Sequence, residues 1–187
     1  LNLTTHPIRK ILLKSGKLFI LRKSSFKIRR FCLLVLDISH QGGCLCGQVR
    51  YEVEGDPELN GVCHCRYCQC RTGSAFGVNI YFHKDKVSVR SGKMKSFRFQ
   101  TESDHYFLTE FCLNCGTTVF LKPELAGENI GIAAGTFDPP TFWLSPSVEV
   151  FTRNKAKFFE TTILKKYDTT KFHQEVNIDD PSKRKLE

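Results

Sequence analysis

Cysteine spacing is the feature that most restricts how this chain can fold. Eight of the nine cysteines lie in three tight groups between residues 44 and 115. The groups are Cys44 and Cys46, then Cys63, Cys65, Cys68 and Cys70, then Cys112 and Cys115. Cysteines one or two residues apart are poorly placed to form disulfides with each other, but their thiolates can bind one metal ion. The spacing therefore favours zinc sites over a disulfide framework.

The first and third groups together predict a structural zinc site. Its four ligands are Cys44, Cys46, Cys112 and Cys115. Four thiolates complete the tetrahedral shell of zinc and leave no open position. Gly47 and Gly116 each follow the last cysteine of a pair, where a side chain is expected to obstruct the turn around the sulfur atoms. The alternative is that these cysteines are redox-active or merely buried.

The middle group predicts a second zinc site. In an extended segment Cys63 and Cys65 share a face, and Cys68 follows Cys65 at the spacing of a metal-binding turn. His64 lies between two ligands, so we expect it to point away from the metal as a structural or supporting residue. Cys70 leaves two alternatives open. It closes a four-sulfur shell, or it faces elsewhere and leaves the fourth position to water or substrate.

Two arginines flank this second group and are candidate substrate-binding residues. Arg66 and Arg71 carry planar guanidinium groups, which bind carboxylates through paired hydrogen bonds. The alternative for both is an ordinary solvated charge.

The positive charge of the chain is concentrated near its N-terminus. Residues 1–36 hold nine of the 28 lysines and arginines and no acidic residue, and the remaining 19 basic residues equal the 19 acidic ones. Any nucleic-acid binding is therefore expected from this leader alone. An acid-free basic leader suits an organellar transit peptide, and a disordered extension is the alternative. No apolar run reaches the roughly 18 to 20 residues that a membrane span needs, so no membrane association is expected.

Short alternating or apolar runs, separated by turn residues, predict an all-β fold. The expected strands are residues 48–54, 76–82, 86–90, 95–100, 105–111, 117–121, 129–134 and 148–152. One helical turn is expected at residues 123–126. We divide the chain into a leader at 1–40 (targeting or disordered), a zinc-binding β domain at 41–165 and a polar tail at 166–187.

The cysteine blocks resemble those of a known family, the glutathione-dependent formaldehyde-activating enzymes, whose domain also occurs in centromere protein V. The resemblance covers about residues 42–159. It includes Gly-Gly-Cys-Leu-Cys-Gly at 42–47, Cys-His-Cys-Arg-Tyr-Cys at 63–68, Phe-Cys-Leu-Asn-Cys-Gly-Thr at 111–117 and Ala-Gly-Thr-Phe-Asp at 134–138. Three blocks in the same order form a specific signal. Cys70 departs from the family pattern, where we expect a basic or polar residue.

The resemblance implies a β-tent fold, in which small antiparallel sheets are pinned by zinc. It implies that Cys44, Cys46, Cys112 and Cys115 hold the structural ion. It also implies that Cys63, Cys65 and Cys68 hold an exchangeable, catalytic-type ion. Glutathione is then the thiol partner and formaldehyde the electrophile.

Three functions remain open from the sequence. The first is a zinc-dependent carbon–sulfur lyase or synthase that acts on the adduct of a small thiol, by resemblance S-(hydroxymethyl)glutathione. The second is a non-catalytic zinc module that binds a protein or nucleic acid. The third is a redox or metal-buffering protein that uses the same thiols. The expected compartment is the cytoplasm, with the mitochondrion as the alternative.

Overall fold

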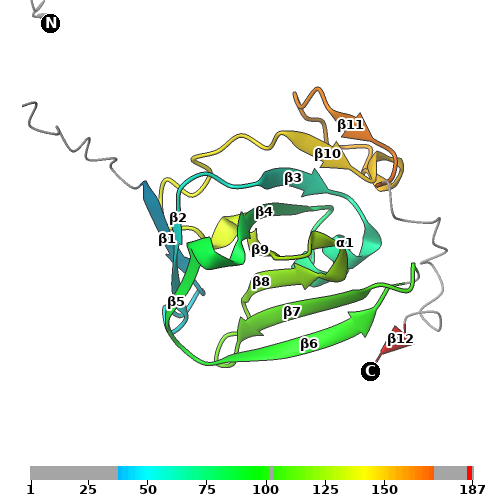
Figure 1. Cartoon of the computed structure of the whole chain (residues 1–187). Helices are drawn as coiled ribbons and strands as arrows, with labels where there is room; N and C mark the ends of the chain where they lie inside the picture. Colours follow the sequence, from blue (N-terminus) through cyan, green and yellow to red (C-terminus); the bar gives the residue numbers. More distant parts are fainter. Residues whose placement is uncertain (1–37, 102, 171–184, 187) are drawn as a thin grey trace, which may run out of the picture. The chain divides into compact units, whose positions relative to one another are not determined.

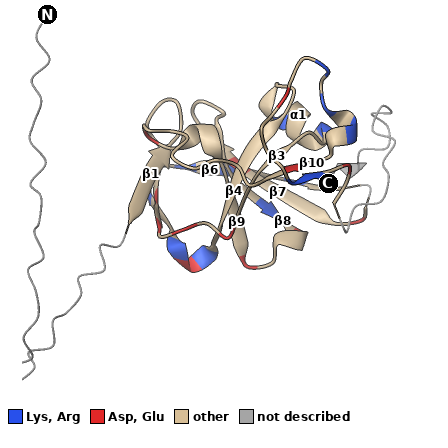
Figure 2. Ribbon diagram, turned by 90° about the horizontal axis from the view of Figure 1, so that it is seen from above, with Lys and Arg blue, Asp and Glu red and all other residues tan. Residues whose placement is uncertain are grey.

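The computed structural model describes residues 38–101, 103–170 and 185–186 (Figure 1). Most of the predicted leader and of the predicted polar tail lies outside these residues. The described part is built mainly from antiparallel strands, as the sequence predicts. No helix within it is long and apolar enough to cross a membrane. Residues of both charge signs are distributed over these strands and turns (Figure 2), in keeping with the balanced charge of this part of the sequence.

A three-stranded antiparallel sheet lies at one end of the described domain (Figure 1). Its strands are β1 (Ser39–Gly43), β2 (Arg50–Glu54) and β5 (Val87–Ser91), with β2 in the centre. Tyr51 and Val53 alternate along β2 with more exposed residues, and both are buried. This sheet therefore presents an apolar face to the core.

A nine-stranded sheet forms the rest of the domain, in the order β11-β10-β3-β4-β9-β8-β7-β6-β12. Its strands are β3 (Leu59–Cys63), β4 (Gly77–His83), β6 (Met94–Gln100), β7 (Tyr106–Cys112), β8 (Thr118–Pro123), β9 (Asn129–Ala133), β10 (Val148–Val150), β11 (Lys166–Tyr167) and β12 (Lys185–Leu186). All neighbours pair antiparallel except β10, which runs parallel to both β3 and β11. This parallel pairing brings the segment after residue 148 beside the Cys63 block.

One α-helix, α1 (Arg66–Thr72), interrupts the strands, and the sequence did not predict it. Its only buried residue is Cys68, so it has no apolar stripe from which a helix is recognised. Local contacts at its two ends define the helix instead. The Cys65 sulfur accepts a hydrogen bond from the backbone N–H of Cys68, and Gly73 ends the helix with φ 63°. The predicted turn at 123–126 is confirmed by a 3₁₀ turn at Glu124–Ala126.

Side chains from both sheets share one core. Tyr51 of the small sheet meets the rings of Phe120 and Phe137 edge-on, with centroids 5.4 and 5.5 Å apart. The Tyr51 hydroxyl lies 2.9 Å from Oγ1 of Thr136. Gly42 is required beside this ring, because a Cβ atom there would lie 2.2 Å from the Tyr51 oxygen. The core thus joins the segment before the first cysteine pair to strands that follow the last pair.

Candidate metal centres and the adjoining cavity

The first candidate centre combines two cysteine pairs that are distant in the sequence. The sulfur atoms of Cys44, Cys46, Cys112 and Cys115 all lie within 4.8 Å of one another. The sulfur of Cys46 is 3.4 Å from that of Cys44 and 3.7 Å from that of Cys112. Tetrahedral zinc with bonds of about 2.3 Å separates its sulfur ligands by about 3.8 Å. This thiol set therefore fits zinc and leaves no position for another ligand.

Two glycines allow the chain to turn around these sulfur atoms. Gly47 and Gly116 have φ values of 76° and 71°, and each donates its backbone N–H to the carbonyl of the first cysteine of its pair. A Cβ atom at either position would meet nothing within 4 Å. Glycine is thus favoured there by the left-handed backbone conformation and not, as expected from the sequence, by a lack of space.

Hydrogen bonds support the sulfur atoms of this centre. The backbone N–H of Val49 donates to the Cys44 sulfur at 3.2 Å. The Thr117 hydroxyl lies 3.2 Å from the Cys115 sulfur. Together with the Thr117 backbone N–H, this hydroxyl lowers the pKa of Cys115 to about 5. Such bonds favour the thiolate, which is the form that binds a metal.

The second candidate centre contains three thiols. The sulfur atoms of Cys63, Cys65 and Cys68 lie within 4.8 Å of one another, at the end of β3, at the start of α1 and inside α1. Cys70 is exposed and lies outside this group. Residues two apart on a helix point in very different directions, so Cys68 and Cys70 cannot both face the same ion. Among the described residues, Cys70 therefore does not complete a four-sulfur shell.

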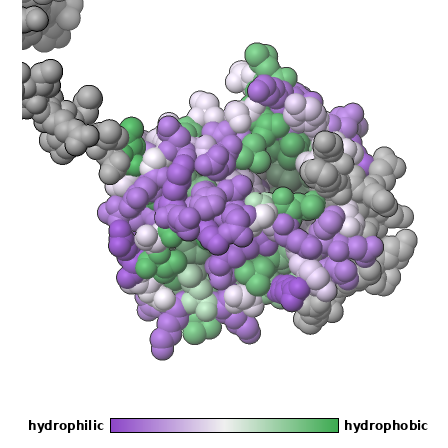
Figure 3. All heavy atoms as spheres, viewed as in Figure 1, coloured by the Kyte–Doolittle hydropathy of each residue, from purple (hydrophilic) through white to green (hydrophobic). Residues whose placement is uncertain are grey.

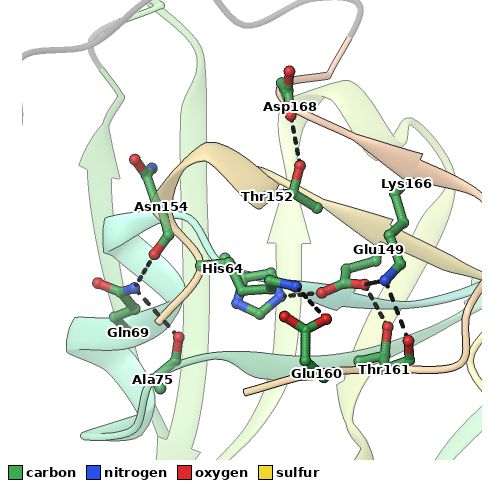
Figure 4. A network of polar contacts seen from close by, with 11 residues as sticks. His64, Gln69, Ala75, Glu149, Thr152, Asn154, Glu160, Thr161, Lys166 and Asp168 are labelled. Atoms are coloured by element: carbon green, nitrogen blue, oxygen red, sulfur yellow. Dashed lines mark hydrogen bonds and ion pairs between the residues drawn. The ribbon is translucent and has the colours of Figure 1, made fainter. Parts of the chain in front are cut away.

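His64 does not join the thiols, in agreement with the orientation expected from the sequence. Its side chain is fully buried, and Nε2 lies 2.8 Å from Oε1 of Glu149 (Figure 4). The other oxygen of Glu149 accepts a hydrogen bond from Thr161 and lies 3.5 Å from Nζ of Lys166. The Nδ1 atom of His64 is buried without a partner. This network connects the middle cysteine block to the segment from β10 to β11.

Glu149 is a supporting residue that sequence reasoning missed. Burial alone would raise the pKa of Glu149, but hydrogen bonds from Thr161 and His64 and the charge of Lys166 keep it below its usual value. Alternation with Val148 and Val150 would suggest an exposed carboxylate, because successive side chains of a strand point to opposite faces. In the structure Glu149 is completely buried.

Arg71 and Asn79 form a second support behind Cys68. An Nη atom of Arg71 donates to Oδ1 of Asn79 at 2.8 Å and lies 4.0 Å from the Cys68 sulfur, and Nδ2 of Asn79 lies 3.7 Å from the same sulfur. Hydrogen bonds with Cys63 and Cys65, followed by the charge of Arg71, hold the pKa of Cys68 well below its usual range. Arg66 is exposed on α1.

A cavity of about 400 Å³ adjoins the three thiols, and all three line its wall. Hydrophobic residues gather around a hollow near β3 and β10 (Figure 3). Neither Arg66 nor Arg71 belongs to the lining, so the structure does not bring these predicted carboxylate-binding residues to the cavity. Three thiolates leave the fourth tetrahedral position of a zinc ion open. The donor set thus fits a zinc ion that a small molecule can reach from the cavity.

Two comparisons relate the chain to known proteins. A crystal structure of a Rhodobacter sphaeroides protein matches with a TM-score of 0.42 and 20% sequence identity, covering 57% of this chain and 97% of that one. The family model of the glutathione-dependent formaldehyde-activating enzyme matches residues 39–154, which is more than half of the chain and includes all eight clustered cysteines. The chain therefore belongs to the family of glutathione-dependent formaldehyde-activating enzymes.

Proposed function

We propose that the protein is an enzyme that makes or breaks a carbon–sulfur bond between a small thiol and an aldehyde, at a zinc ion held by Cys63, Cys65 and Cys68. One observation carries the proposal: three thiols converge on the wall of a cavity, while Cys70 faces elsewhere. Glutathione and formaldehyde are the substrates named in the description of the family. The product of their reaction is S-(hydroxymethyl)glutathione.

The residues around the thiols have distinct roles in this proposal. When bound, zinc supplies a Lewis acid that holds the substrate thiol as its thiolate near neutral pH. Cys63, Cys65 and Cys68 would hold the ion, and all three line the wall of the cavity. Arg71 and Asn79 hold the Cys68 sulfur from behind through their contacts at 4.0 and 3.7 Å. These contacts favour the ionised ligand and orient it.

The four-cysteine centre has a structural role in the same proposal. Its sulfur atoms come from the loop after β1, from the last residue of β7 and from the turn that follows β7. A closed thiolate shell offers no position to a substrate, and it contributes its binding free energy to folding. We therefore assign this centre to stability and the three-thiol centre to the reaction.

Metal content and thiol binding test the assignment together. The wild-type chain, purified under reducing conditions, is expected to hold two zinc ions, and Cys65→Ser one. After replacement of zinc by cobalt, glutathione is expected to change the absorption spectrum of the wild-type protein and not that of Cys65→Ser. The matched control is Cys70→Ser, which should retain both ions and the spectral change. Unchanged glutathione binding in Cys65→Ser would refute the proposal.

The reaction is measured by magnetisation-exchange NMR, in which the enzyme should accelerate exchange between formaldehyde and its glutathione adduct beyond the spontaneous rate. A zinc-loaded protein that binds glutathione without accelerating this exchange would be a binding module and not an enzyme.

A further inference from the structure

The cavity beside the three thiols is mainly apolar. Its lining includes Leu59, Phe107, Leu125, Val148, Val150 and Phe151. Among the described residues that line it there is no lysine, arginine, aspartate or glutamate. The polar groups of the described lining are amides, hydroxyls, the three thiols and the imidazole of His105. The cavity therefore suits an uncharged organic group, because removing a charge from water without a partner is costly.

The apolar wall lies directly beside the reacting position. Val150 of β10 is paired with Cys63 of β3 in the parallel register of these strands. Asn79 contacts the Cys68 sulfur, and Tyr81, two residues further along β4, also lines the cavity. Residues two apart on a strand project from the same face. A group attached to the reacting carbon would thus enter the apolar space.

Neither substrate named for the family fills this space well. Formaldehyde brings a single carbon and no substituent. Glutathione carries two carboxylates and an ammonium group, and the described lining offers no lysine, arginine, aspartate or glutamate to pair with them. The imidazole of His105, which also lines the cavity, already lies 3.7 Å from a carboxylate oxygen of Glu124. The charged ends of glutathione are therefore better placed outside the apolar part of the cavity, which leaves room beside the thiol.

We propose that this site also accepts aldehydes whose carbonyl carbon bears an uncharged apolar chain of several carbons, with that chain seated against Val150 and its neighbours. The inference rests on the proposed function and extends it to a further class of substrate. In the reaction the thiolate sulfur bonds to the carbonyl carbon, and the π electron pair moves to the oxygen. The oxygen takes a proton from solvent to give a hemithioacetal. No oxidant or reductant is needed.

Two glutathione thioethers test the apolar subsite without depending on the reaction rate. S-hexylglutathione and S-methylglutathione carry the same charges and differ by five methylenes, so any charge recognition cancels between them. Full burial of a methylene strengthens binding about fourfold, and partial burial of the chain should give about tenfold or more in total. In isothermal titration of the zinc-loaded full-length chain, S-hexylglutathione is expected to bind more tightly by that factor. Equal affinities would overturn the inference.

Two cavity variants and one control test whether the hexyl chain binds in this cavity. Val150→Asn places a polar group in the cavity and should reduce the preference for the hexyl compound to less than threefold. Leu125→Asn, at a lining position that is 42% exposed, should reduce it without affecting folding. Val89→Asn is the control, because Val89 lies on β5, is 50% exposed and does not line the cavity. A preference unchanged in both cavity variants would place the alkyl chain elsewhere and refute the inference.

Failure of this inference and failure of the proposed function are distinguishable. Accelerated exchange of formaldehyde with equal binding of the two thioethers would refute only the apolar subsite. A tight hexyl complex in a protein that accelerates no exchange, with formaldehyde or with hexanal, would refute the enzyme and with it the wider substrate range. The expected result is acceleration with both aldehydes, and a larger ratio of kcat/KM between hexanal and formaldehyde in wild type than in Val150→Asn.

Discussion

His64 Nε2 and Glu149 Oε1 lie 2.8 Å apart, and both side chains are fully excluded from solvent. The two residues are 85 positions apart in the chain. His64 stands between two of the proposed zinc ligands, so this contact fixes the cysteine block to β10. A backbone hydrogen bond of 3.0 Å from His64 N–H to the Val150 carbonyl reinforces it. The proposed reaction site therefore depends on a strand that lies far later in the sequence.

Replacement of Glu149 by glutamine should destabilise the protein, because a buried carboxylate that accepts three polar contacts loses its charge. Hydrogen bonds to charged groups contribute roughly 1.5 to 3 kcal/mol, and we expect a loss in this range at pH 7, measured by urea unfolding. Glu54→Gln, at an exposed position, should change the free energy of unfolding little.

The effect of Glu149→Gln should depend on pH in a definite direction. The pKa of Glu149 is lowered in the folded state despite its burial, through the contacts with Thr161, His64 and Lys166. Its contribution to stability is therefore present above the ordinary glutamate value of about 4.5 and is lost as the pH falls below it. The difference between wild type and variant should stay nearly constant from pH 7 to about pH 5 and shrink as the pH falls below about 4.5. A difference that grew on acidification would contradict the contacts described.

Removal of the Arg71 charge should weaken zinc binding at the three-thiol centre. Supporting contacts of this kind typically change metal affinity by about 10- to 100-fold, and we expect a loss in that range for Arg71→Met. Competition with a chromophoric chelator measures it. Arg66→Met, on the same helix but exposed, is the matched control and should retain wild-type affinity. Equal losses in the two variants would indicate a general effect of charge.

The two centres should differ in what their loss does to the fold. Cys112→Ser opens the four-thiol shell between distant strands, so it should lower the unfolding temperature strongly and expose apolar surface to a reporter dye. Cys65→Ser should lose one zinc ion while keeping most of the strand signal in circular dichroism. If Cys65→Ser unfolded the chain as fully as Cys112→Ser, the division into a structural and a reactive centre would be wrong.

Gly116→Ala should destabilise the turn that carries Cys115. The residue has φ 71°, a conformation that costs a residue with a Cβ atom roughly 1 to 2 kcal/mol. Urea unfolding of the zinc-loaded protein should show a loss of that size. Gly135→Ala is the control, since Gly135 has open space around it and no positive φ, and it should remain close to wild type.

The eight strands expected from the sequence each overlap an observed strand, because alternation and turn residues are local signals. Four strands were not predicted: β1, β3, and also β11 and β12, which lie in the segment expected to be a polar tail. For β1 and β3 the reason is physical. β1 reads Ser-His-Gln-Gly-Gly, and β3 contains Asn60 and Gly61, all of low β-propensity. Contacts with neighbouring strands hold β1 and β3 in place instead. A Cβ atom at Gly61, for example, would lie 2.8 Å from a methyl group of Val148, so β10 packs closely only because residue 61 is glycine.

The two thiol groups were predicted from the spacing of their cysteines, but spacing alone did not decide every member. Cys70 has the same spacing from Cys68 as Cys65 has from Cys63, and it lies outside the group. The residues that support these thiols were not predictable. Glu149 and Asn79 reach the cysteine block only through the pairing of β10 with β3 and of β3 with β4. Such register depends on the whole sheet, and a single sequence contains no direct signal for it.

The parallel pairing of β10 with β3 has a consequence for the order in which a newly made chain becomes competent. All four cysteines of the four-cysteine centre have left the ribosome once Cys115 has emerged, so zinc can bind this centre while synthesis continues. Val150 and the carboxylate that meets His64 follow more than thirty residues later. A ribosome-stalled chain that ends between these points would bind zinc at the four-cysteine centre but would lack the residues that complete the three-thiol centre. The proposed reaction site would therefore form last.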